Sequence, residues 1–189
     1  MPSERADPRN PGFSPGTIYF AGMLKRYAFC IPYVFDKVVF DVPCGTGWGA
    51  SYLFGYKKLY AMDIIQEPLM YCRKNFSDNI NLITGNMIHI PIKTNSIDCV
   101  LCLDGYEHIC LEHQFIFMNE VVRILKKGGT FILTTPIFFD KHLYRNPYHE
   151  HEATLDEIHT AVTKYFTTIY EYITDEQSDP AIYLVGNKR

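Results

Sequence analysis

The sequence predicts an α/β protein built on a doubly wound sheet of seven strands, mostly parallel, with an antiparallel last strand. Apolar, β-branched runs alternate with segments of helical periodicity along most of the 189 residues, which is typical of this class. The runs are continuously apolar, as in parallel strands that are buried on both faces. The final two runs are joined by the short turn EQSDP, which is too short for the crossover that parallel pairing requires.

The first half of the chain contains three expected strands and three expected helices. The strands are expected at 37–42, 58–64 and 80–85, and the helices at 16–31, 48–54 and 68–75. Pro32 is expected to end the first helix, because a proline disfavours the helical conformation of the residue before it. Residues 1–15 are polar and proline-rich, so we expect a flexible tail followed by one domain over 16–189.

The second half contains four expected strands and two expected helices. The strands are expected at 96–105, 130–136, 167–174 and 181–187, and the helices at 111–125 and 155–165. The sequence KKGG at 126–129 is expected to end the first of these helices, with lysines in its last turn and glycines after it.

Composition and charge exclude several classes of protein. The net charge is −3 and no run of Lys or Arg exceeds two residues, so a nucleic-acid partner is not expected. No apolar stretch approaches the roughly 20 residues that span a bilayer, and the N-terminal residues lack the apolar core of a signal peptide. Six scattered cysteines are expected to be reduced and mostly buried, which favours a cytoplasmic protein. Cys99 and Cys102 are three apart in a strand and should point to opposite faces.

A glycine-rich turn follows the first expected strand and indicates a ligand site. In a doubly wound sheet, ligands bind at the carboxyl ends of the strands, beside the first strand. Gly45 and Gly47 lie at this end, where glycines let the backbone turn sharply and approach a ligand closely. Asp63 ends the second strand, eighteen residues after Gly45, where a carboxylate can accept hydrogen bonds from two ribose hydroxyls. The pattern therefore predicts a nucleoside-containing ligand.

A dinucleotide is the alternative, because Gly45-x-Gly47-x-x-Ala50 also fits the NAD(P) pattern of an oxidoreductase. Three observations disfavour it. Asp41 would lie beside the pyrophosphate, which is also negatively charged. The Tyr-x-x-x-Lys pattern, Tyr33 to Lys37, lies before the first strand and on the wrong side of the turn. The antiparallel terminal pair is also unusual for dinucleotide-binding sheets.

Five segments in order resemble the motifs of the class I S-adenosylmethionine (SAM)-dependent methyltransferases. They are VVFDVPCGTGWG, AMDI, GNMIHIPI, SIDCVLCLDGYEHI and RILKKGGTFILTTP, and the resemblance covers about 16–189. It implies a Rossmann-like fold, SAM as the cofactor and methyl transfer as the activity. A SAM-fold protein that serves as a binding partner is the non-enzymatic alternative, and the combination of Asp41, Gly45, Gly47 and Asp63 argues against it.

The resemblance also implies which residues bind the cofactor. The full set is Asp41, Cys44, Gly45, Gly47, Asp63, Ile64, Asn86, Met87 and Asp104. In the family pattern the two glycines approach the methionine and ribose of SAM. Asp41 contacts the amino group of the methionine, and Asp63 binds the ribose hydroxyls. Asn86 and Met87 would contact the adenine. Pro43 departs from the family pattern, which usually has Gly or Ala there. Arg26 and Tyr27 close over the SAM carboxylate in one interpretation, and Arg26 is a solvated helix residue in the other.

The methyl acceptor should approach over the fourth and fifth strand ends, where a long connection, 137–153, holds three histidines. A long irregular connection is often a binding loop, and a solvated surface loop is the alternative. Methyl transfer to a hydroxyl requires a proton acceptor, and His108, His149 and His151 are the candidate bases.

Two further resemblances concern the acceptor. Asp104, Glu107, His108 and His149 resemble the divalent-metal set of small-RNA 2′-O-methyltransferases, which is an alternative to an expected metal-free site. RYAFCIPYV and NPYHEHEAT resemble bacterial methyltransferases that are associated with cell-surface polysaccharide and sugar modification. That resemblance implies O-methylation of a glycan, a sugar or another small hydroxylated acceptor.

Overall fold

The computed structural model describes residues 6–76, 79–138, 146–174 and 180–189. Residues 1–5 of the expected tail, 139–145 of the long connection and 175–179 of the final turn lie outside the described residues.

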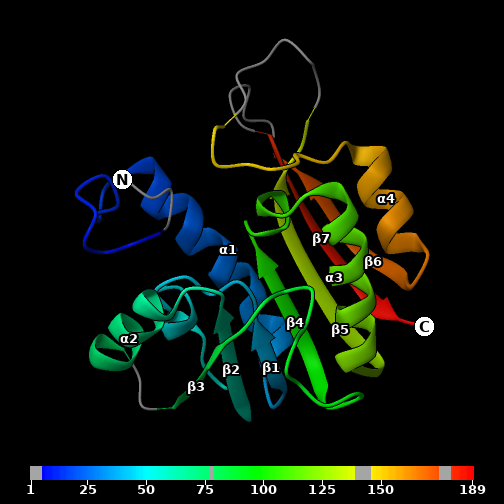
Figure 1. The fold of residues 1–189 in the computed structure, drawn as a ribbon, viewed down its shortest axis with the longest axis horizontal. Coiled ribbons are helices and arrows are strands. Elements are labelled where there is room, and N and C mark those ends of the chain that lie inside the picture. The colour runs from blue at the N-terminus through cyan, green and yellow to red at the C-terminus, as the bar shows by residue number, and fades with distance from the viewer. Residues whose placement is uncertain (1–5, 77–78, 139–145, 175–179) are drawn as a thin grey trace.

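A seven-stranded sheet in the order β3-β2-β1-β4-β5-β7-β6 confirms the predicted fold class (Figure 1). The strands are β1 (Val38–Asp41), β2 (Lys58–Asp63), β3 (Ile80–Thr84), β4 (Ile97–Leu103), β5 (Leu125–Pro136), β6 (Phe166–Ile173) and β7 (Ala181–Lys188). The first five strands are parallel, and β7 pairs antiparallel with both β5 and β6. The strand order reverses at β1, so the carboxyl ends of β1 and β4 diverge beside the glycine turn.

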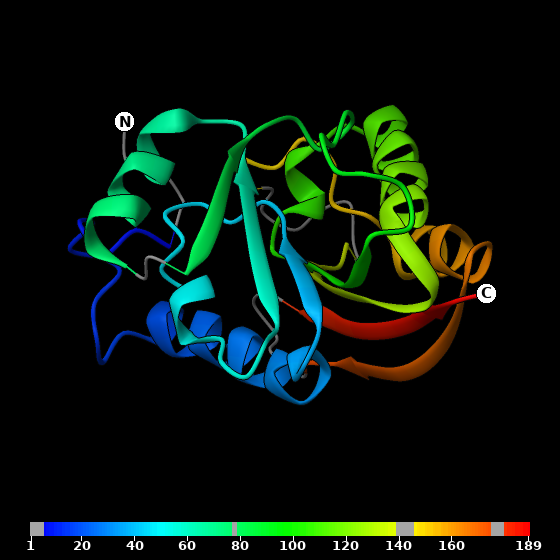
Figure 2. The same ribbon diagram turned by 90° about the horizontal axis from the view of Figure 1, so that it is seen from below.

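Helices cover both faces of the sheet. They are α1 (Ile18–Val34), α2 (Gln66–Asn75), α3 (Leu111–Ile124) and α4 (Leu155–Thr163), with single 3₁₀ turns at η1 (Ala50–Tyr52) and η2 (Tyr106–His108). Figure 2 shows α1 on one side of the sheet and α3 and α4 on the other. Buried residues of α1 and α2 belong to one apolar core, and those of α3 and α4 belong to the second. None of the described helices combines the length and the apolar character needed to cross a bilayer.

The two faces also separate the cysteines as predicted. Cys99 packs in the core beneath α1 and α2, and Cys102 packs in the core beneath α3 and α4. All six cysteines are described, five of them are buried, and each is a free thiol.

Two expected helix boundaries are wrong. The helix α1 continues past Pro32 to Val34. Pro32 lies in the last turn and lacks the N–H that would bond to the preceding turn, and the burial of Val34 in the core accompanies the extra residues. The segment 48–54 forms only the 3₁₀ turn η1, because Leu53 is already extended and Gly55 has a φ of +75°.

The KKGG sequence does not lie at the end of a helix. The helix α3 ends at Ile124, and Lys126 and Lys127 belong to the start of β5. Lys126 pairs with Asp98 on the neighbouring strand at 2.7 Å, and the helix has Arg123 in its last turn instead. The glycines therefore accompany the irregular pairing of β4 with β5 and do not cap α3.

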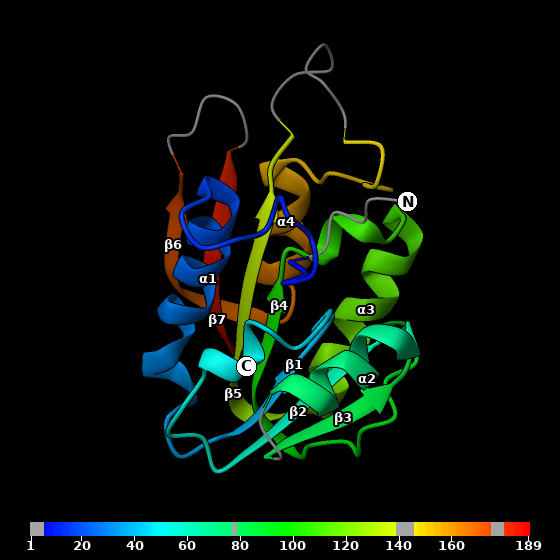
Figure 3. The same ribbon diagram turned by 90° about the vertical axis from the view of Figure 1, so that its left-hand side faces the viewer.

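Residues 6–15, which belong to the expected flexible tail, pack on the domain. Phe13 is 2% exposed and contacts the Trp48 ring edge-on, with ring centroids 4.7 Å apart. Figures 1 and 3 show this segment beyond the carboxyl ends of β1 and β2. Phe13 is thus part of the apolar core on the α1 side of the sheet.

Candidate functional site

A cavity of about 1570 Å³ opens at the carboxyl ends of the parallel strands. Its walls come from α1, the glycine turn, the ends of β2 and β4, and the antiparallel pair β6 and β7. Pockets for one small ligand are usually about 300–1,000 Å³, so this cavity has room for a cofactor and a second molecule together.

The three glycines of the turn are explained by two different structural reasons. Gly45 lines the cavity with a φ of +54°, and a Cβ atom built on it meets no protein atom within 4 Å. Gly47 is not among the described residues that line the cavity, and its Cβ would lie 2.2 Å from Cys72 Sγ. A Cβ on Gly49 would lie 1.8 Å from the Tyr27 ring. Close packing against α2 and α1 therefore explains Gly47 and Gly49, and only Gly45 leaves space for a ligand.

Pro43 also has a packing partner that explains it. A Cβ atom on Gly105 would lie 2.1 Å from Pro43 Cδ, so the proline ring occupies the space over that glycine. The departure from the family pattern at Pro43 is thus matched by the absence of a side chain at Gly105.

Asp63 connects the end of β2 to the glycine turn. Its Oδ2 accepts a hydrogen bond from the Gly45 N–H at 2.9 Å, and its Oδ1 accepts one from the Ile65 N–H at 2.9 Å. The carboxylate is buried but lines the cavity. A carboxylate offers about four lone-pair positions, so two backbone donors do not exhaust its capacity to accept hydrogen bonds.

Asp41 lies beneath the cavity wall. Its side chain is completely buried, and Asp41 is not among the described residues that line the cavity. The Tyr27 hydroxyl donates to its Oδ2 at 3.1 Å, and its Oδ1 has no hydrogen-bond partner among the described residues. Burial raises the pKa of Asp41 to about 7, and the hydrogen bond from Tyr27 opposes that change. Asp41 therefore faces the Tyr27 hydroxyl of α1, and its expected contact with the SAM amino group stays a prediction.

The remaining expected cofactor residues lie around the cavity. Cys44, Ile64, Asn86, Met87 and Asp104 all line it. Met87 is buried beside Asn86, whose Oδ1 accepts a hydrogen bond from the Ile88 N–H at 3.1 Å. The side chain of Ile64 is exposed toward the opening. Seven of the nine expected residues are thus gathered on one surface, and Asp41 and Gly47 lie behind it.

Arg26 forms an ion pair with Asp104 across the cavity. The Arg26 Nε lies 2.7 Å and 2.6 Å from the two oxygens of Asp104, and Thr134 Oγ1 donates to the same carboxylate at 2.9 Å. The Arg26 side chain is 15% exposed, so the interpretation as a solvated helix residue is wrong. This pairing also occupies Asp104, which separates it from the other three residues of the expected metal set.

Glu107, His108 and His149 form a compact cluster at the end of β4. Each offers one ligand atom, and these atoms lie within 4.8 Å of one another. Glu107 is 2% exposed and accepts a hydrogen bond from Thr135 Oγ1 at 2.9 Å. Burial, and secondarily the nearby Asp104 carboxylate, raise the pKa of Glu107.

Both histidines of the cluster are oriented through the same ring nitrogen. The Nδ1 of His108 lies 3.0 Å from the Tyr148 carbonyl oxygen, and the Nδ1 of His149 lies 2.5 Å from Glu152 Oε1. The two rings meet edge-on with centroids 5.2 Å apart. The sequence analysis did not identify Tyr148 or Glu152; the His149-x-x-Glu152 spacing is the signal that could have indicated this pair.

His151 lies elsewhere. It is not among the described residues that line the cavity, and its Nε2 is 3.4 Å from Glu157 Oε2 at the start of α4. The structure therefore brings His108 and His149 together and leaves His151 apart from them.

An aromatic wall, formed by Phe29, Tyr170, Tyr172 and Tyr183, closes the cavity on the β6 and β7 side. Phe29 lies 5.3 Å from Tyr170 and 5.4 Å from Tyr183 between ring centroids. Tyr172 and Tyr183 are paired across the two strands, so their rings lie on the same face. The alternation Tyr-x-Tyr at 170–172 was the available signal, but the sequence analysis did not use it.

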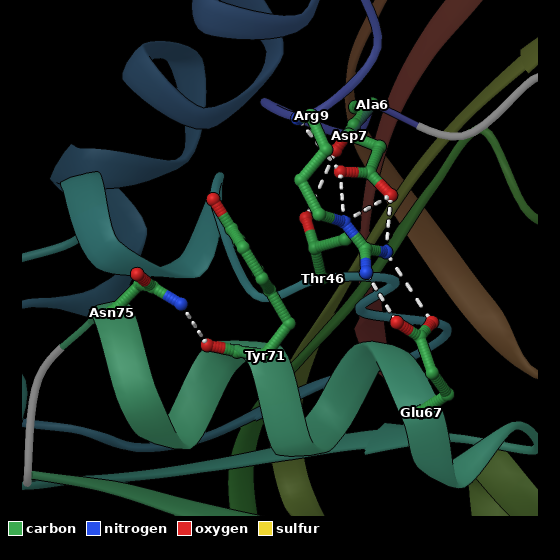
Figure 4. Close-up of polar contacts among 7 residues, drawn as sticks. All are labelled: Ala6, Asp7, Arg9, Thr46, Glu67, Tyr71 and Asn75. Carbon is green, nitrogen blue, oxygen red and sulfur yellow. Dashed lines mark hydrogen bonds and ion pairs between the residues drawn. The ribbon is translucent and has the colours of Figure 1, made fainter.

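The N-terminal segment joins the glycine turn to α2 (Figure 4). Thr46 Oγ1 donates to the Ala6 carbonyl oxygen at 3.0 Å, and Ala6 itself lines the cavity. Arg9 forms ion pairs with Asp7 and with Glu67 at the start of α2. The sequence analysis did not anticipate this contact, because the segment is polar and lacks periodicity.

Comparison with known proteins identifies the fold and the family. Residues 40–133 match the model of a family described as "Methyltransferase domain". A protein of Mycolicibacterium smegmatis named "Probable S-adenosylmethionine-dependent methyltransferase" is 26% identical over 125 residues, which are 64% of this chain and 48% of that protein. The chain thus spans about half the length of the curated relatives that it matches. These matches decide against the NAD(P)-linked alternative.

Two solved structures share the fold. One, from Pyrococcus horikoshii, has a TM-score of 0.77 at 18% identity and covers 95% of this chain and 96% of its own. The other is a Burkholderia thailandensis 1,6-didemethyltoxoflavin-N1-methyltransferase with bound S-adenosylhomocysteine, with a TM-score of 0.72 at 16% identity and coverage of 89% and 78%.

Proposed function

Because the chain belongs to the class I SAM-dependent methyltransferase superfamily, we propose that it transfers the methyl group of SAM to a hydroxyl of a sugar or another small hydroxylated acceptor. The observation that carries this proposal is the pair His108 and His149 in the wall of a cavity large enough for both molecules. The acceptor enters on the side of the aromatic wall.

The cofactor side of the cavity fits SAM. Gly45 leaves open space beside the backbone, and the Asp63 carboxylate lines the cavity with capacity for the ribose hydroxyls. Ile64 and Met87 offer apolar contacts to the adenine, with Asn86 beside them. When bound, SAM supplies an activated methyl group on a positively charged sulfur. Asp41 acts from behind the wall, where it positions Tyr27 through their hydrogen bond.

The acceptor side fits a hydroxyl. A hydroxyl loses its proton during methyl transfer, and His108 and His149, which both line the cavity, are the proposed acceptors of that proton. The acceptor oxygen forms a bond to the methyl carbon as the carbon–sulfur bond breaks, and the sulfur keeps the electron pair. The aromatic wall offers ring faces that pack against the apolar face of a sugar or a similar ring.

The test uses the purified chain with methyl-labelled SAM and a panel of free sugars, phenyl glycosides, simple alcohols, amines and thiols. We expect label on hydroxyl compounds, with glycosides preferred over simple alcohols. Replacing His108 or His149 by Ala should lower turnover by about 10²–10⁴-fold, with unchanged affinity for S-adenosylhomocysteine in calorimetry.

His151→Ala is the matched control, because His151 is not among the described residues that line the cavity. It should retain turnover. Labelled amines or thiols without labelled hydroxyls would refute the proposal, as would full turnover in both of the other histidine variants.

A further inference from the structure

We propose that Glu107, His108 and His149 bind one divalent transition-metal ion, and that the acceptor hydroxyl coordinates to it. The catalytic part of this inference rests on the proposed hydroxyl acceptor, whereas metal binding by the three side chains stands without it. The set is smaller than the four residues that the sequence suggested, because Asp104 is paired with Arg26.

The spacing of the three ligand atoms suits one ion. They lie within 4.8 Å of one another. Bonds from nitrogen or oxygen to an ion such as zinc are about 2.1 Å, so two ligands of one ion are at most about 4.2 Å apart. At tetrahedral or right angles the ligand atoms of one ion are about 3.0–3.4 Å apart, so side-chain rotations that close the cluster by up to about 1.5 Å would complete the site.

The hydrogen bonds of the two histidines prepare the same nitrogen on each ring. Tyr148 and Glu152 hold the Nδ1 atoms, which makes Nε2 the nitrogen that would bind the ion. A metal-binding histidine almost always donates its other N–H to a carboxylate or a backbone carbonyl, and both kinds of partner are present here. His151 and His159 show the contrast: each points its Nε2 at a glutamate, Glu157 and Glu171.

The environment of Glu107 favours a cation. A carboxylate with 2% exposure is costly to bury unless it is paired or coordinates a metal. The nearby Arg26 is already bound to Asp104. A divalent ion bound by Glu107 would supply a positive charge beside this buried carboxylate.

Three protein ligands leave further coordination positions open toward the cavity, as in catalytic metal sites. An acceptor hydroxyl in such a position would become more acidic and would release its proton to the surrounding water, and His108 and His149 would then serve as metal ligands in place of acting as bases. Its oxygen then attacks the methyl carbon, the sulfur departs with the electron pair, and the positive charge of the sulfonium is neutralised. Two imidazoles and one carboxylate suit manganese, cobalt or zinc, whereas magnesium and calcium prefer ligand sets made of oxygen.

The first experiment measures metal binding without any acceptor. Protein dialysed against a chelator is titrated with Co²⁺, followed by its visible spectrum and by elemental analysis. We expect one ion per chain in the wild type, and loss of binding in Glu107→Gln and His149→Gln. Glu152→Gln should weaken binding by about 10–100-fold, because it removes the group that orients a ligand. His159→Gln is the matched control and should bind like the wild type.

Affinity for S-adenosylhomocysteine shows that each variant is folded. Absence of a stoichiometric ion in the wild type, or equal binding in the Glu107 and His149 variants, would overturn the metal site. The second experiment tests transfer to the best hydroxyl acceptor with chelator and with added Mn²⁺ or Zn²⁺. We expect loss and then recovery of turnover. Transfer that survives complete chelation refutes the metal's role in catalysis and leaves the hydroxyl proposal standing, whereas metal binding without any hydroxyl transfer refutes only the proposed function.

Discussion

The buried carboxylate of Asp41 should make the unfolding free energy of the protein depend strongly on pH. Burial raises its pKa from 3.8 to about 7 in the folded chain. Between these two values the unfolded chain has lost the proton while the folded chain keeps it, so stability falls as the pH rises. A difference of about three pKa units corresponds to about 4 kcal/mol, at about 1.4 kcal/mol for each unit.

The substitution Asp41→Asn removes this titration and keeps an oxygen that can accept the Tyr27 hydroxyl. We expect the variant and the wild type to be similar in stability at pH 4. At pH 8 the variant should be more stable by up to about 4 kcal/mol. Urea unfolding from pH 4 to pH 8 measures this difference, with the fluorescence of the single tryptophan, Trp48, as the probe.

Asp98→Asn is the matched control. Burial opposes ionisation of Asp98, but hydrogen bonds from Lys126 and the Val38 N–H prevail and lower its pKa. The contribution of Asp98 to stability is therefore lost only below the usual pKa of an aspartate. In Asp98→Asn, the slope of the unfolding free energy against pH between pH 4 and pH 7 should remain that of the wild type. Parallel curves for Asp41→Asn and the wild type over pH 4–7 would refute this account of Asp41.

Four other substitutions test the site and the segments around it. Asp63→Ala should weaken SAM binding at least tenfold in calorimetry, because hydrogen bonds to a charged group contribute about 1.5–3 kcal/mol each; unchanged affinity would contradict its place in the ribose site. Phe13→Ala should cost about 3–5 kcal/mol of stability and change the fluorescence of Trp48, and an unaltered urea midpoint would show that residues 6–15 contribute nothing to the fold. Gly45 and Gly47 both have a positive φ, so Ala is strained at either position; Gly45→Ala should in addition lower SAM affinity, since its Cβ faces the cavity, whereas Gly47→Ala should destabilise the fold further through contact with Cys72 Sγ at 2.2 Å. A larger loss of stability at Gly45 than at Gly47 would refute the separate roles of these glycines.

The sequence predicted the sheet because its information is local and periodic. Continuous apolar runs mark the parallel strands, and the short turn before β7 requires an antiparallel end. Where a local signal has two meanings, prediction failed. The KKGG sequence is equally suited to the end of a helix and to an irregular strand start, and only pairing with β4 decides between them. Residues 6–15 carry little local signal, so their position depends on the contact of Phe13 with Trp48.

The sequence by itself determined the type and order of the main elements, the family and seven of the nine expected cofactor residues that line the cavity, since these follow from motifs at strand ends. Only the tertiary structure decided what each side chain faces. It placed Asp41 behind the cavity wall and paired Asp104 with Arg26. It also separated His151 from His149, although these two residues are only two positions apart in the chain. The physical reason is that these contacts join α1, β4 and the segment before α4, and no local pattern specifies which of several polar side chains meet when distant elements pack.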